Sequence, residues 1–224
     1  MGLSSKSIER IDVSRSTLAT EVYNRIVDAL VQGSLAPGDR LIQNRLAEEL
    51  GVSRTPVRDA LLKLREEGAI EATGRRGYTV RQLSADDVRD IYDAREAIEG
   101  QAAALVARRG PDAIRTVRLA LEEGIATPAE TPAASFEANR VIHRGIVAAI
   151  GNPHLLGFFD TLWGRALAGH AYHDFYVAAP YTEFVNDHRT LVEALGNADP
   201  EHARRAAIAH IRRGRDRTLS APDD

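Results

Sequence analysis

Apolar residues recur at helical spacing in the first third of the chain. They stand every four positions on one face: Leu18, Val22, Ile26 and Leu30. This spacing predicts an amphipathic helix that begins near Thr17 and ends before Gly33, because glycine interrupts helices. Residues 1–16, which carry no such pattern, are expected to form a flexible arm.

Two shorter helices follow, separated by a tight turn. The first is expected around residues 44–50 and ends at Gly51, since glycine takes the left-handed cap conformation at little cost. The second is expected to begin after Ser53, a good N-cap residue. Its apolar face carries three residues: Val57, Leu61 and Leu64.

Two β-prone runs, residues 70–73 and 78–81, flank a glycine-bounded turn and predict a hairpin. The tip of this hairpin is basic, with Arg75 and Arg76. Three helices and a β-hairpin over residues 17–82 predict a winged helix-turn-helix, in which the third helix can enter a major groove.

From residue 83 onward the pattern is helical throughout. Ser84 and Asp87 form a capping signal that places a domain boundary near residues 82–84. Helices are expected near 84–108, 112–125, 135–150, 154–170, 181–196 and 200–218. The fold class is therefore mainly α, with an all-α bundle over residues 83–218 and a short tail, 219–224.

Charge and histidine are distributed unevenly. The net charge is −3 overall, but residues 1–83 carry 13 Lys and Arg against 11 Asp and Glu, whereas residues 84–224 carry 16 against 21. All seven histidines lie in the second part. A mildly basic first part and an acidic second part that contains the histidines suggest that the two parts of the chain have different functions.

The sequence also argues against several classes of protein. The absence of cysteine excludes disulfides and thiolate zinc sites. No membrane-spanning apolar stretch and no signal peptide is recognisable, so we expect a cytoplasmic protein with no membrane partner. Hydrolase, P-loop and Rossmann motifs are missing, and no catalytic residue is expected.

The start of the third helix carries side chains that are typical of a DNA-binding helix. Arg54 and Arg58 lie four positions apart on the face opposite the apolar residues, where arginine can grip guanine. Ser53 and Thr55 can donate to phosphates, and Arg75 can approach the backbone or minor groove. The alternative is that these arginines are ordinary surface charges.

Three helices of the second part carry a histidine on an otherwise apolar face. These are His143, with Asn139 one turn earlier, His188 and His210. Facing helices of a bundle can build a metal site from such residues, and imidazole suits Zn, Ni, Cu or Fe. The alternatives are histidines in a polar core, or a pocket that binds an organic ligand without metal.

Arg95 interrupts the apolar face of the helix near 84–108. Its charged end extends to solvent at the rim of the bundle, or it pairs with Glu99, four positions on, or it receives a carboxylate ligand through two hydrogen bonds. These interpretations stay open at this point.

The run Leu46-Ala47-Glu48-Glu49-Leu50-Gly51-Val52-Ser53-Arg54-Thr55-Pro56-Val57-Arg58 resembles the signature of the GntR family of bacterial transcription regulators. The resemblance implies operator contacts by these residues: Asn44, Arg45, Arg54, Thr55, Arg58 and Gly77. Gln43 and Asp59 stand where many members carry Glu, which does not affect the expected fold.

The run Tyr92-Asp93-Ala94-Arg95-Glu96-Ala97-Ile98-Glu99 and the histidine helices resemble the FCD effector domain of the FadR-type branch. Many such domains hold a divalent metal and a small organic acid. The resemblance implies Zn, Ni or Mn bound by Asn139, His143, His188 and His210. Many members carry Asp where Asn139 stands, so weaker metal binding or dependence on an anionic ligand is expected.

These observations together predict a ligand-responsive repressor that binds operator DNA as a homodimer and senses a small carboxylate. A homodimer is expected because helix-turn-helix proteins usually read two symmetric half-sites. The alternative hypotheses are the same regulator with a metal-free ligand pocket, or a metal-dependent hydrolase.

Overall fold

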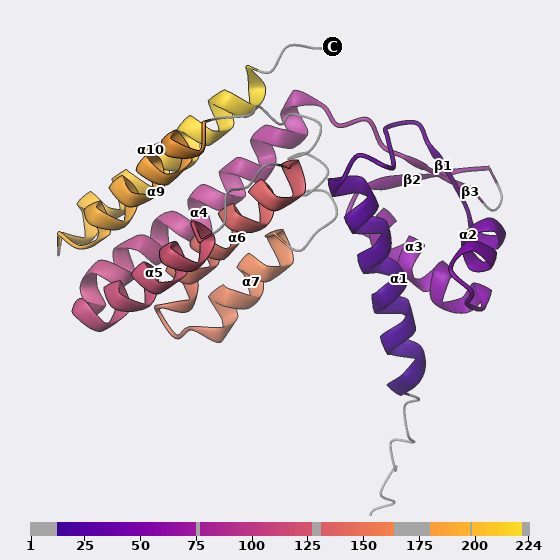
Figure 1. Cartoon of the computed structure of the whole chain (residues 1–224), viewed down its shortest axis with the longest axis horizontal. Coiled ribbons are helices and arrows are strands. Elements are labelled where there is room, and N and C mark those ends of the chain that lie inside the picture. The colour runs from indigo at the N-terminus through magenta and orange to yellow at the C-terminus, as the bar shows by residue number, and fades with distance from the viewer. Residues whose placement is uncertain (1–12, 75–76, 127–130, 164–179, 198, 221–224) are drawn as a thin grey trace, which may run out of the picture.

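The computed structural model describes residues 13–74, 77–126, 131–163, 180–197 and 199–220 of the 224-residue chain. Three helices come first: α1 (Val13–Val31), α2 (Gln43–Glu49) and α3 (Arg54–Glu66). After a small sheet come α4 (Ala85–Arg109), α5 (Pro111–Gly124), α6 (Pro132–Ala148), α7 (Pro153–Trp163), α9 (Tyr181–Leu195) and α10 (Pro200–Leu219). Figure 1 shows the first three helices and the sheet on one side and a helical bundle on the other.

The first unit is built around the apolar faces of α1 and α3. The residues that the periodicity places inside are buried together, among them Val22, Ile26, Leu30, Val57, Leu61 and Leu64. Leu18 is an exception, because 45% of its surface is exposed. Helix α1 begins at Val13, so the prediction of an arm over residues 1–16 was wrong for its last four residues. Residues 1–12 lie outside the described part.

The sheet has one strand more than the predicted hairpin. Strands β2 (Ile70–Thr73) and β3 (Gly77–Val80) pair antiparallel as expected, and β1 (Arg40–Ile42) pairs with the other edge of β3. Strand β1 was missed because it is only three residues long and buries only Leu41, which is too little for a period-two pattern. Arg75, at the predicted wing tip, lies outside the described residues.

The junction between the two units is held by a capping box. The Ser84 hydroxyl accepts from the Asp87 backbone N–H at 3.2 Å, and the Asp87 carboxylate accepts from the Ser84 N–H at 2.9 Å. The predicted start of this helix is therefore confirmed. Arg81, just before the box, pairs with Asp87 and donates to the Gly68 carbonyl at the end of α3. Arg81 thus joins the first unit to α4.

The second unit is a bundle of helices in which α10 runs alongside α4 (Figure 1). Its core is formed by small and aliphatic side chains such as Ala102, Val106, Val117, Ile142 and Leu195. Within the described residues no strand follows β3, so the all-α prediction is confirmed for this part. The predicted helix 154–170 is seen as α7 up to Trp163, and the rest of its range lies outside the described residues. No helix of the described part is long and apolar enough to span a membrane.

Candidate functional site

The start of α3 presents its polar side chains to solvent. Val57 is completely buried, whereas Arg54, Thr55 and Arg58 are exposed on the opposite face, as the spacing predicts. Ser53 stands at the N-cap position in an extended conformation, and its side chain makes no capping hydrogen bond. Its hydroxyl is therefore not used to cap the helix.

Helix α2 places two more of the predicted residues at the surface, Asn44 and Arg45. Arg45 pairs with Glu49 at 2.7 Å. Gln43 has a role that the sequence did not indicate: its side chain donates to the Arg54 carbonyl at 2.8 Å and so links the starts of α2 and α3. Two arginines and several hydroxyl and amide groups near a helix N-terminus can bind the phosphates and base edges of DNA.

In the bundle, four predicted ligands come together from three helices. His143 of α6, His188 of α9 and His210 of α10 are buried, and their ligand nitrogens all lie within 4.8 Å of one another. The Nε2 atoms of His143 and His210 are 3.3 Å apart, and Asn139 Oδ1 lies 2.9 Å from His188 Nε2. We call these four residues the histidine cage.

Hydrogen bonds outside the cage fix the orientation of two rings. His188 Nδ1 lies 2.8 Å from the Phe184 carbonyl, which can only accept, so this nitrogen carries the hydrogen. His143 Nδ1 contacts a carboxylate oxygen of Glu99 and is assigned in the same way. In the neutral rings both Nε2 atoms then present lone pairs inside the cage.

The surroundings of His188 and His210 favour neutral imidazole. Burial, and then His143, lowers the pKa of His188 to about 3. The same causes hold the pKa of His210 well below that of a free histidine. Neutral imidazole is the form that binds metal ions, so the low pKa values of His188 and His210 suit these two rings to a metal site.

Glu99 is a site residue that the sequence indicates only as a partner for Arg95. Its carboxylate is buried, accepts from Trp163 Nε1 at 3.1 Å and Arg95 Nε at 3.0 Å, and contacts His143. Burial alone would raise the pKa of Glu99, but Arg95 and then His143 outweigh it and lower the pKa to about 2. Glu99 is therefore ionised at neutral pH.

Arg95 shows the pairing that the sequence had left open. It is buried with its Nε bound to Glu99, and its guanidinium lies 4.4 Å from the centre of the Trp163 ring. Its predicted second role, receiving a carboxylate ligand, stays a prediction.

The geometry of the cage fits a divalent metal. Two ligands held at 2.0–2.1 Å in a tetrahedron are separated by about 3.3 Å, which matches the spacing of the His143 and His210 Nε2 atoms. Asn139 Oδ1 and His188 Nε2 lie 2.9 Å apart, and both atoms can act as ligands of one metal ion. His210 Nδ1 is buried without a hydrogen-bond partner among the described residues.

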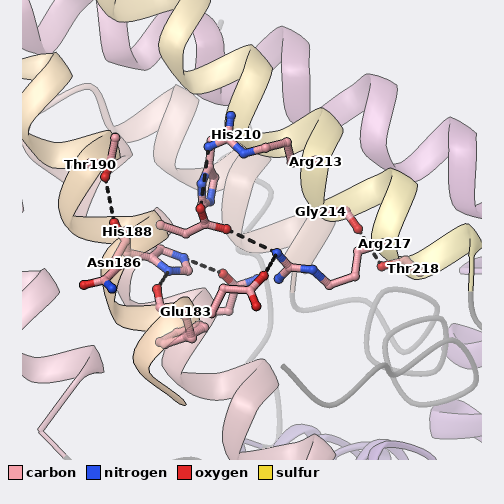
Figure 2. Close-up of polar contacts among 12 residues, drawn as sticks. Glu183, Asn186, His188, Thr190, His210, Arg213, Gly214, Arg217 and Thr218 are labelled. Atoms are coloured by element: carbon pink, nitrogen blue, oxygen red, sulfur yellow. Dashed lines mark hydrogen bonds and ion pairs between the residues drawn. The ribbon is translucent and has the colours of Figure 1, made fainter. Parts of the chain in front are cut away.

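Ion pairs hold α9 and α10 together beside the cage (Figure 2). Arg217 of α10 donates to Glu183 at 2.7 Å and to Asp187 at 3.3 Å, both on α9. Because His188 and His210 lie on these same two helices, the pairs help to fix the separation of the two rings.

Comparison with known proteins agrees with this division of tasks. Residues 18–80 match the family model of bacterial regulatory proteins, gntR family, and residues 90–213 match the FCD domain. The chain belongs to the GntR family. It is a transcriptional regulator with an FCD domain, and not an enzyme, as the sequence predicts.

Relatives of this GntR protein match it over most of their length. A probable D-xylose utilization operon transcriptional repressor of Paenarthrobacter nicotinovorans is 30% identical over 200 residues, 89% of this chain and 88% of the relative. The HTH-type transcriptional regulator McbR of Escherichia coli (strain K12) is 30% identical over 191 residues, 84% and 86% of the two chains.

Solved structures agree with the fold. E. coli McbR/YncC superposes with a TM-score of 0.72 at 26% identity, covering 90% of this chain and 97% of that one. A putative transcriptional regulator GntR from Rhodococcus sp. RHA1 gives 0.74 at 21% identity, covering 92% and 99%. The GntR head implies DNA binding, and FCD domains often bind metal, for which the described residues hold a suitable histidine triad.

Proposed function

We propose that this GntR protein is a homodimeric repressor that releases its operator when a small organic acid binds at a metal ion in the FCD domain. One observation carries the proposal: a helix with exposed arginines belongs to the same chain as a cage of three buried histidines and a half-buried amide. The first can read DNA, and the second can hold a metal and, through it, an anion.

For the DNA-binding part, residues 17–82, the contacts fall to the exposed residues of α2 and α3 with the wing. These are Asn44, Arg45, Ser53, Arg54, Thr55, Arg58, Arg75 and Gly77. The full chain is mixed with a random-sequence DNA duplex pool and the bound duplexes are sequenced. A homodimer is expected to select an inverted repeat whose half-sites are spaced by about one helical turn. A single unrepeated motif would contradict the dimer.

For the effector part, residues 83–218, Asn139, His143, His188 and His210 would hold Zn, Ni or Mn. The bound ion would supply a Lewis-acid anchor for a carboxylate. Arg95 is proposed to add a positive charge toward the same ligand. The ligand can change DNA affinity only if it binds the two arrangements of the dimer unequally.

The decisive experiment is elemental analysis of the dialysed protein after incubation with Zn, Ni and Mn. About one ion per chain is expected for the parent, with loss of the ion in His188→Ala. His154→Ala, an exposed histidine on α7, is the matched control and should keep the ion. Absence of metal from the parent would refute the metal site and leave a metal-free ligand pocket in a DNA-binding regulator.

A further inference from the structure

The cage has an unusual charge balance for a metal site. A metal ion would be held by three imidazoles, which bind metals in their neutral form, and by the amide oxygen of Asn139, so the ligands bring no negative charge. A divalent ion would bring two positive charges into a buried place. Burial of uncompensated charge is costly, so a negative charge close behind the ligands would raise the affinity for the ion.

Glu99 is the buried acidic residue of the described part of the chain. Its side chain is 1% exposed, and its Oε2 atom contacts His143 Nδ1, on the side of the ring that faces away from the cage. Glu183 and Asp187 on α9 are more exposed and are already paired with Arg217. The charge best placed to act on the cage is therefore that of Glu99.

Arg95 also interacts with the Glu99 carboxylate. It binds Oε1 of Glu99 at 3.0 Å, and Trp163 donates to that oxygen at 3.1 Å, so the two oxygens of the carboxylate have different tasks. Oε1 is held by the arginine and the indole, while Oε2 is directed at His143. The pair of Arg95 and Glu99 is neutral as a whole, and the arginine weakens the field that Glu99 exerts on the cage.

We propose that Glu99 is a positioning residue that supplies the negative charge of this metal site through His143, and that Arg95 limits that charge. This inference rests on the metal binding proposed above. The carboxylate fixes the His143 tautomer with Nε2 toward the cage and increases the basicity of that nitrogen. Metal affinity is then set by the balance between the two partners of one buried ion pair.

The test compares three variants of the full chain: Glu99→Gln, Arg95→Met and the double variant. Affinities for Zn²⁺ and Co²⁺ are measured by competition with a chelator. Glu99→Gln should bind each ion about 10- to 100-fold more weakly, the usual effect of removing such an outer partner. Arg95→Met should bind each ion several-fold more tightly, because the charge that opposes Glu99 and repels the ion is gone.

The double variant separates an electrostatic role from a purely structural one. Glu99→Gln removes the carboxylate that binds the buried Arg95 and should lower the thermal stability of the metal-free protein. The double variant removes both charges, so its stability should recover while its metal affinity stays low. The ligand-field spectrum of the Co²⁺ complex should shift in both variants that lack the carboxylate.

The outcomes distinguish this inference from the proposed function. Recovery of metal affinity together with stability in the double variant would overturn the inference, because Glu99 would then serve only as a partner for Arg95. Weaker or unchanged metal binding in Arg95→Met would also overturn it. A parent protein that takes up neither Zn²⁺ nor Co²⁺ would instead refute the proposed metal site itself, and the inference with it.

Discussion

A close contact between two helices of the bundle lies beside the cage and can be tested by adding one methyl group. Gly145 is on α6, two residues after His143, and is buried against α5. A Cβ atom built at Gly145 would lie 2.1 Å from the Cβ of Ala120. Gly145→Ala should therefore push α5 and α6 apart and displace the ligands that α6 carries.

The magnitude follows from the contact. Carbon atoms approach one another to about 3.5–4.0 Å, so the helices would have to separate by about 1.5 Å. Overpacking of this kind costs about 1–3 kcal/mol, and the better helix propensity of alanine offsets up to about 1 kcal/mol of it. We expect a net loss of roughly 1–2 kcal/mol, with weaker metal binding because such sites tolerate displacements of only about 0.5 Å.

Urea unfolding of the metal-free protein gives the loss of stability, and chelator competition with Zn²⁺ gives the loss of affinity. Gly157→Ala is the matched control, since Gly157 is an exposed glycine of α7 with no described atom within 4 Å of a built Cβ. That control should be as stable as the parent or slightly more stable. If Gly145→Ala matched it in both stability and affinity, the reasoning from helix separation would be wrong.

Three further predictions concern the head, the junction and the cage. Arg58→Ala should weaken binding to the selected DNA duplex by about 1–3 kcal/mol in a filter-binding titration, with metal content unchanged. Arg81 lowers the pKa of Asp87 to about 2, so the ion pair between them stabilises the folded protein. This contribution to the free energy of unfolding is present above about pH 4 and is lost as the pH falls through 2. Because the pair is partly solvated, we expect a small effect. In urea unfolding at pH 7 the free energy of unfolding of the parent should be higher than that of Asp87→Asn by about 1 kcal/mol, and this difference should vanish near pH 2. Asn139→Asp should bind Zn²⁺ more tightly in chelator competition, and equal affinity would refute a charge deficit in the cage.

Much of the fold could be predicted because its signals are local. The apolar spacing of Val22, Ile26 and Leu30 is a property of one helix, and the cap formed by Ser84 and Asp87 spans a single turn. Such features are present in the sequence before any tertiary contact forms.

The cage was also predictable in outline, and for a different reason. A histidine in the middle of an apolar face conflicts with the pattern around it, as His143, His188 and His210 do on three helices. A local rule that is broken on facing elements often marks a functional site. Asn139 joined these three residues because it lies one turn before His143 on the same helix face, and the family resemblance implied the same four ligands.

What the sequence did not reveal depends on contacts between distant residues. Glu99 and His143 are 44 positions apart, and Glu99 and Trp163 are 64 apart, so no spacing indicates that one carboxylate serves both. Strand β1 likewise forms only because β3 offers it an edge. These features depend on tertiary packing, which periodicity does not encode.

Helix α4 connects the two functional parts of the molecule. Its first turn carries Asp87, which Arg81 ties to the end of α3, and its middle carries Arg95 and Glu99 beside the cage. The 12 positions from Asp87 to Glu99 correspond to about 18 Å along one uninterrupted helix. If the proposed ligand changes the pairing of Arg95, it acts on the same helix that Arg81 ties to the DNA-binding unit. The ligand then changes DNA affinity only if it binds unequally to the two arrangements of the dimer, which differ in the position of this helix.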